Sequence, residues 1–253
     1  MPAHHLPEPL PEGTLIGPAS HEALLRAGTA FVTRVIERYR DRRAVIAWQV
    51  EHEAVDPLGM EHSWRLSAGL VRHEVEAARA ADPSRPVMMN GFLPTSTPVR
   101  LMQWWRSRDQ GDSLAVAREL ADVAGLDFYP RNAVASRGGL ALYLDGSRHP
   151  WQRRPWTRTL RWAAAAPGRR LMIAEGQAEP WEAVTTPPDP LRGEMYSCRP
   201  EHVIGNYNEA MRRCRGGTPP WAYLFWGAEY WLLRAQGGDP RYVGAFARVL
   251  AEA

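Results

Sequence analysis

The stretch VIAWQVEHEAVDP, residues 45–57, decides the fold that this sequence predicts. It belongs to a short apolar and β-branched run over 44–50, which is typical of a strand buried on both faces of a sheet. The run then ends in three polar residues, Glu51, His52 and Glu53. Because polar groups are costly in a core, their position directly after a buried strand indicates the end of a sheet where functional groups gather.

The same order of helix and strand recurs along the chain. Apolar residues at three- and four-residue steps predict amphipathic helices, and short apolar runs between turn signals predict strands. Helices are expected near 20–41, 63–81, 113–124, 156–166, 200–214 and 239–252, and strands near 44–50, 86–92, 126–130, 171–177 and 221–227, with a polar excursion over 94–112. Five such alternations predict the α/β class, with a parallel sheet and helical crossovers.

Length and composition are those of a soluble globular protein, with 253 residues, 45% hydrophobic and 23% charged. We expect one domain over 1–253, with a Pro-rich irregular lead at 1–19. No apolar run reaches the length of a membrane span, and the N-terminus lacks a secretory signal pattern, which favours the cytoplasm. Cys198 and Cys214 lack a metal-type spacing, so neither a disulfide framework nor structural zinc is expected.

The basic residues are all Arg, since the sequence contains no Lys. This bias, beside many Ala, Gly and Pro residues, is typical of a GC-rich coding sequence. The runs RYRDRR at 38–43 and RHPWQRRPWTR at 148–158 have the composition of a nucleic-acid surface. Asp41 and the preceding Glu37 instead give the first run the pattern of a solvated helix face, and no nucleic-acid partner is expected.

Five residues stand at or just beyond the ends of different predicted strands: Glu53, Asn90, Tyr129, Glu175 and Trp226. The carboxyl ends of parallel strands meet at one face of a (β/α) barrel, where its active site lies. No glycine-rich phosphate loop follows any strand, which removes the main support for a nucleotide-binding sheet. Two carboxylates at such ends predict glycoside hydrolysis, in which one protonates the leaving oxygen and the other attacks the anomeric carbon.

Four segments resemble strands of the clan A glycoside hydrolases, the (β/α)8 TIM-barrel family that includes β-galactosidases and cellulases. IAWQVEHEA at 46–54 resembles the W-Q-x-E-N-E ending of their fourth strand, and LMIAEGQAEPW at 171–181 resembles their seventh-strand nucleophile segment. YLFWGAEYWLL at 223–233 is similar to their eighth strand, and GLDFYP at 125–130 fits the sixth. The resemblance implies a TIM-barrel-like fold that is incomplete, with strands four to eight present.

The resemblance also implies a role for each site residue. Glu53 aligns with the acid/base and Glu175 with the nucleophile of a retaining mechanism on β-linked glycosides, which requires no cofactor. Trp226 would stack on a sugar face, as large flat side chains do well. The residues implied to bind hydroxyls or orient the nucleophile are Asn90, Tyr129 and Gln177. The sequence does not fix the sugar or the linkage.

Two features depart from the family pattern. His52 stands where the family has an Asn that hydrogen-bonds the sugar 2-hydroxyl, so this transition-state contact is weakened. The 43 residues before the first main strand leave no room for three further βα units, which are expected to be absent. Such a remnant would expose strand edges, and a second chain that completes the barrel, or a homo-oligomer, would cover them.

Two other functions compete with a glycosidase. The dipeptide His-Glu occurs at 21, 52 and 73, but none continues to H-E-x-x-H, so no metal site is expected. The second is a carbohydrate-binding remnant that keeps a Trp-lined mouth and has lost its acid/base machinery. His52 and the late start of the chain favour this alternative.

Overall fold

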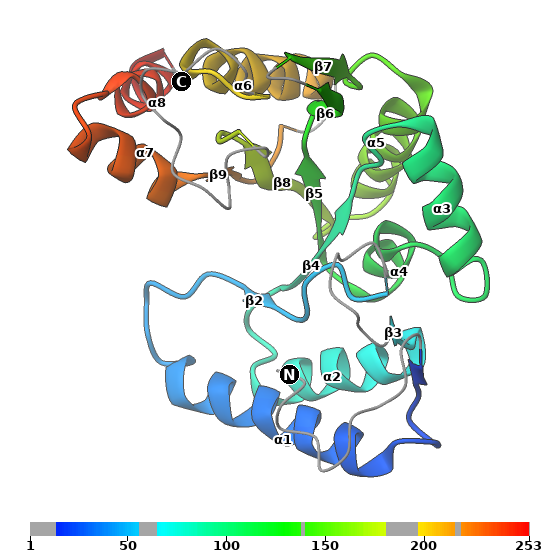
Figure 1. Ribbon diagram of the computed structural model, residues 1–253. Coiled ribbons are helices and arrows are strands. Elements are labelled where there is room, and N and C mark those ends of the chain that lie inside the picture. Colours follow the sequence, from blue (N-terminus) through cyan, green and yellow to red (C-terminus); the bar gives the residue numbers. More distant parts are fainter. Residues whose placement is uncertain (1–13, 56–64, 138–139, 181–196, 216–218, 253) are drawn as a thin grey trace. The chain divides into compact units, whose positions relative to one another are not determined.

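The computed structural model describes residues 14–55, 65–137, 140–180, 197–215 and 219–252 (Figure 1). The chain separates into two compact units, which are described here one at a time. Unit 1 comprises residues 1–92, 98–125 and 165–170, and unit 2 comprises 93–97, 126–164 and 171–253. Most of the expected Pro-rich lead, residues 1–13, lies outside the described residues.

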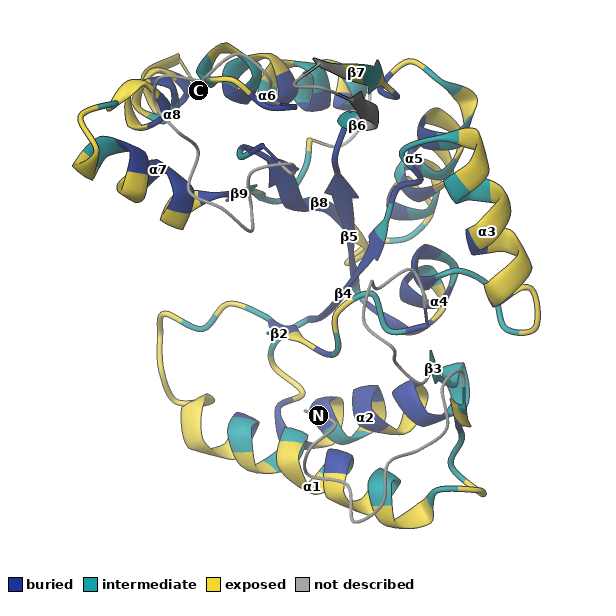
Figure 2. Cartoon of the chain, viewed as in Figure 1, coloured by how far each residue is buried: buried dark blue, intermediate teal, exposed yellow. Residues whose placement is uncertain are grey.

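The strands expected from the apolar runs are present. They are β2 (Trp48–Gln49), β4 (Val87–Phe92), β5 (Val123–Phe128), β8 (Arg170–Gln177) and β9 (Tyr223–Trp226), hydrogen-bonded in the order β2-β4-β5-β8-β9. The pairs β2-β4 and β8-β9 are parallel. Figure 2 shows β4, β5 and β8 buried along nearly their whole length, as strands covered on both faces should be. The predicted α/β class with a parallel sheet is confirmed.

Unit 1 contains the helices α1 (Glu22–Tyr39), α2 (Ala68–Ala81) and α4 (Ser113–Leu120) and nearly all of α3 (Thr97–Ser107). Helix α1 packs against α2, and α4 packs against β4. The starts of α2 and α4 are capped, since the side chain of Ser67 accepts from Leu70 N and that of Asp112 accepts from Ala115 N. A pair of two-residue strands, β1 (Leu15–Ile16) and β3 (Arg65–Leu66), runs parallel beside them.

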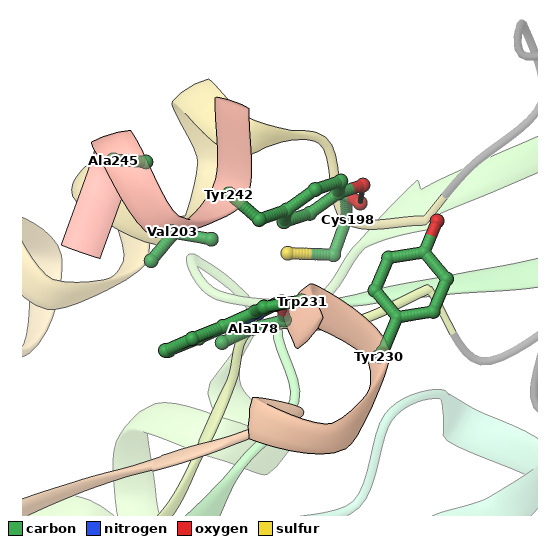
Figure 3. Close-up of a cluster of buried hydrophobic side chains, with 7 residues drawn as sticks. All are labelled: Ala178, Cys198, Val203, Tyr230, Trp231, Tyr242 and Ala245. Atoms are coloured by element: carbon green, nitrogen blue, oxygen red, sulfur yellow. Dashed lines mark hydrogen bonds between the residues drawn. The ribbon is translucent and has the colours of Figure 1, made fainter. Parts of the chain in front are cut away.

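Unit 2 contains an antiparallel hairpin, β6 (Arg131–Arg137) and β7 (Leu140–Asp145), followed by α5 (Pro150–Ala164), α6 (Pro200–Cys214), α7 (Ala228–Gln236) and α8 (Arg241–Glu252). Its aromatic core gathers the rings of Tyr230, Trp231 and Tyr242 around Cys198 and the segment that follows β8 (Figure 3). Trp231 Nε1 donates to Ala178 O at 2.7 Å, and Tyr242 donates to Cys198 O at 2.6 Å. The first bond fixes the chain just beyond the end of β8, and the second fixes the segment that leads into α6.

The structure corrects several expected elements. The strand expected at 44–50 is reduced to Trp48–Gln49, and the preceding Ile46 is exposed. The polar excursion at 94–112 contains the helix α3, and the hairpin β6-β7 and the helix α7 were not expected. Within the described parts of the chain, no helix is both long and apolar enough to cross a membrane.

Candidate active site

Glu53 lies on a tight turn that follows the two-residue strand β2. Val50 N donates to Met88 O at 3.0 Å, which is the last ladder bond before the turn. Glu51 and Glu53 then adopt φ values of 58° and 45°. This left-handed conformation is uncommon for residues other than Gly and costs about 1–2 kcal/mol per residue, so the turn must be held by bonds from elsewhere.

Asn90, in the second half of β4, supplies those bonds. Its Oδ1 accepts from Gln49 Nε2 at 3.2 Å and from Glu53 N at 3.3 Å. Its Nδ2 lies 2.9 Å from His52 Nδ1, and since an amide nitrogen only donates, the imidazole accepts there. The structure therefore brings together three predicted site residues of unit 1, His52, Glu53 and Asn90. Gln49 joins them and was not predicted.

Glu175 lies in a bulge of β8. Ile173 is in register with Tyr223 and Gly176 with Phe225, so three steps along β8 match two along β9. A bulge of this kind re-aims a side chain, and bulges are common beside active sites. The Glu175 side chain is 8% exposed, and its Oε2 accepts a hydrogen bond from the Tyr129 hydroxyl at 2.7 Å. That length is typical of a hydroxyl hydrogen bond to an oxygen acceptor.

Gln177 is fully buried at the end of β8. Its Oε1 accepts from Arg131 N at 3.1 Å, and its Nε2 donates to Arg131 O at 2.8 Å. The amide thus pairs with both backbone groups of the first residue of β6. The described contacts give Gln177 the role of anchoring the hairpin, and its binding of a sugar hydroxyl stays a prediction.

Trp226 ends β9 and is 47% exposed, so it is not a core residue. Its side chain is hydrogen-bonded to Glu179. Burial and the charge of Glu229 raise the pKa of Glu179, and the bond from Trp226 opposes that shift. A half-exposed indole that is held by a carboxyl group has a fixed orientation and can present a ring face to a ligand.

Three of the site residues are followed by a glycine that permits a close approach. A Cβ on Gly91, after Asn90, would lie 2.7 Å from Leu114 N, and one on Gly227, after Trp226, would lie 2.7 Å from Glu179 Cβ. A Cβ on Gly176, after Glu175, would overlap the ring of Tyr223. A Gly directly after a polar or aromatic strand end is a signal that sequence reasoning did not use.

The predicted site residues therefore form two groups. His52, Glu53 and Asn90 belong to unit 1, and Tyr129 and Glu175 are bonded to each other in unit 2. Trp226 is in register with Gln177 on the neighbouring strand of unit 2. Within the described ranges, no group of three or more His, Cys, Asp or Glu residues has the arrangement of a metal site.

Comparison with known proteins gives structural similarity only. No family model matches the chain, and no curated protein matches its sequence.

A GH2 β-galacturonidase from Eisenbergiella tayi bound to glycerol aligns with a TM-score of 0.47 at 12% identity, over 91% of this chain and 34% of that one. The GH53 catalytic domain of Ignisphaera aggregans gives 0.44 at 12% identity, over 81% and 54%. The apo β-glucuronidase 3 of Bacteroides uniformis gives 0.41 at 13% identity, over 86% and 24%. This chain spans about a third, a half and a quarter of these three proteins, respectively.

Proposed function

We propose that this chain is a retaining glycoside hydrolase for β-linked glycosides, built as an incomplete (β/α)8 barrel that comprises strands four to eight. Glu175 is the nucleophile and Glu53 is the acid/base. The observation that carries the proposal is the hydrogen bond from Tyr129 to Glu175 at the bulged end of β8. It joins two residues that the sequence resemblance assigned separately to one site.

In the first step, a carboxylate oxygen of Glu175 attacks the anomeric carbon and the glycosidic bond breaks. The Tyr129 hydroxyl is bonded to Oε2, so it orients the carboxylate for this attack. The product is a glycosyl ester on Glu175. The half-exposed ring of Trp226 supplies an apolar face on which the sugar stacks.

Glu53 completes the reaction in its two roles. As an acid it gives its proton to the leaving oxygen, and as a base it later takes a proton from the water that hydrolyses the ester. The bond from Glu53 N to Asn90 fixes the backbone of the turn, while the half-buried side chain keeps access to solvent. A retaining mechanism requires about 5–5.5 Å between the two carboxyl groups, so the proposed function requires this distance between Glu53 and Glu175.

The sharpest test is to trap the glycosyl ester. The chain is incubated with 2,4-dinitrophenyl 2-deoxy-2-fluoro-β-glycosides of the galacto, gluco and manno series, since the fluorine slows hydrolysis of the ester. We expect the mass of one fluorosugar to be added to the peptide that contains Glu175. Glu175→Ala should stay unlabelled, and the exposed control Glu201→Gln should label as the unaltered chain does. A label on another residue, or neither label nor hydrolysis with any of the sugars, would overturn the proposal.

A carbohydrate-binding remnant is the second candidate. It is favoured by His52, which stands where the resemblance implies an amide that faces the sugar. The Nδ1 atom of His52 is hydrogen-bonded to Asn90. Equal and near-zero hydrolysis by the chain and by its Glu53→Ala and Glu175→Ala variants, with sugar binding that Trp226→Ala abolishes, would support this candidate. Completion of the barrel by a second chain or a second copy stays a prediction.

A further inference from the structure

Glu74 is a buried acid that the proposed mechanism does not use. It lies on α2, its residue is 4% exposed, and its Oε2 has no hydrogen-bond partner among the described residues. The opposite helix, α1, makes room for it, because a Cβ on Gly28 would lie 2.5 Å from Glu74 Oε1. A carboxyl group enclosed in this way between two packed helices needs a specific partner.

That partner is Glu51, the first residue of the turn that carries Glu53. The side chains of Glu74 and Glu51 are hydrogen-bonded to each other. Two carboxyl groups can share a hydrogen bond only when one of them is protonated. Burial, together with the charge of Glu51 and this bond, raises the pKa of Glu74 to about 8, so Glu74 holds the proton at neutral pH.

The hydrogen bond from Glu74 ends on the left-handed turn, whose backbone conformation needs stabilising contacts. Glu51 has a φ of 58°, and its carbonyl oxygen accepts from Gln49 Nε2 at 3.2 Å. Asn90 holds the following residues, His52 and Glu53, through its amide. The side chain of Glu51 is a further group through which unit 1 can fix the start of the turn.

We propose that Glu74 is a positioning residue whose protonated carboxyl group donates to Glu51 and thereby holds the left-handed turn that presents Glu53. The consequence for catalysis rests on the proposed function, because it requires Glu53 to be the acid/base. The hydrogen bond and its effect on the turn do not depend on that function.

Several charged groups on the neighbouring elements form ion pairs with one another. Glu22 pairs with Arg26 on α1, Arg72 of α2 pairs with Glu119 of α4, and Arg79 of α2 pairs with Asp122. Strand β4 carries no titratable side chain, and Glu51 is the acidic group that acts on Glu74. The stabilising proton is present below the ordinary glutamate pKa of 4.5 and is lost as the pH rises through about 8.

The first experiment measures the thermal midpoint Tm of the full chain from pH 5 to pH 9. The Tm of the unaltered chain should fall as the pH approaches 8, beyond the fall seen in Glu74→Gln, whose amide donates to Glu51 at every pH. Glu76→Gln, an exposed neighbour on α2, is the matched control and should follow the unaltered chain. Identical profiles for the unaltered chain and Glu74→Gln would overturn the shared proton.

The second experiment reports on the turn itself, without any substrate. The side-chain amide signals of Asn90, assigned by their loss in Asn90→Ser, are followed by ¹⁵N NMR. They should shift with a midpoint near pH 8 in the unaltered chain, shift at every pH in Glu74→Ala, and stay constant in Glu74→Gln. Asn90 signals that Glu74→Ala leaves unchanged would refute the positioning role.

Hydrolysis separates this inference from the proposed function. Glu74→Ala should lower kcat by about 10²-fold with KM nearly unchanged, as a displaced catalytic group does, and Glu74→Gln should restore it. If the Asn90 signals respond but no aryl glycoside is cleaved by any form, the proposed function fails and the positioning role stands. If hydrolysis proceeds and Glu74→Ala changes neither kcat nor the Asn90 signals, the positioning role fails and the proposed function stands.

Discussion

The two glutamates are held by different kinds of structure. Glu53 follows a strand of two residues, on a left-handed turn that depends on side-chain bonds from Asn90. Glu175 lies within a strand of eight residues, in a bulge fixed by the neighbouring strand, and is nearly buried. The difference fits their proposed tasks, because an acid/base exchanges protons with water whereas a nucleophile needs one fixed direction of attack.

Replacing the rigidly held residue should have the largest effect. We expect Glu175→Ala to lower kcat by about 10⁴-fold or more, since no other group can form the ester. Added azide should restore product as a glycosyl azide of inverted configuration, detected by NMR. Activity within tenfold of the unaltered chain would remove Glu175 from the mechanism and end the contrast between the two residues.

The acid/base on the turn should show a smaller loss that depends on the substrate. Glu53→Ala should lower kcat/KM by about 10²–10⁴-fold for alkyl β-glycosides, whose leaving oxygen needs a proton. Formation of the glycosyl ester from a dinitrophenyl glycoside should be nearly unaffected, because that leaving group departs without help. Pre-steady-state release of dinitrophenol measures this step, and an equal loss for both substrates would contradict the assignment.

Tyr129→Phe tests how much the fixed direction of Glu175 matters. It removes a hydrogen bond to a charged group, which is worth about 1.5–3 kcal/mol, and kcat should fall roughly 10- to 100-fold. The exposed Tyr39 provides the control, since Tyr39→Phe should leave kcat unchanged. A fall in Tm without a fall in kcat would show that the bond supports only the fold of unit 2.

The smallest expected effect concerns the turn of unit 1. His52→Asn introduces the residue that the resembled glycosidases have at this position, and under the proposed function kcat/KM should rise by about tenfold through a better bond to the sugar 2-hydroxyl. An Asn side chain also has an oxygen that can accept from Asn90, so the turn should persist. A fall in kcat/KM would instead mean that the imidazole has become part of the support of the turn.

The sequence predicted the main strands but not the two features that aim the glutamates. Apolar runs give strand positions through burial alone, which is a local signal. Neither of the left-handed residues, Glu51 and Glu53, is a glycine, so the sequence gives no sign of the turn. Their conformation depends on Asn90, which lies 37 positions beyond Glu53. The bulge at Glu175 is likewise set by the register with β9, which no local pattern records.

The sequence did not predict that Gln177 is buried, for a similar reason. A polar residue at a strand end has the pattern of a binding residue, and its partner Arg131 lies 46 positions earlier in the chain. The helix α3 was missed because its large apolar residues, including Trp104 and Trp105, are exposed and do not follow the pattern of a buried face. Tertiary contacts, rather than local preference, decide both cases.

The glycines that follow Asn90, Glu175 and Trp226 bear on how this protein can evolve. Any replacement at Gly91, Gly176 or Gly227 adds a Cβ, and the nearest atoms belong to a helix start, an aromatic ring and a neighbouring side chain that cannot all give way. Any single amino-acid replacement at one of these three positions therefore strains the backbone of its strand or the turn after it. Selection for a folded chain alone would preserve these positions, even in a lineage that no longer needed the chemistry beside them.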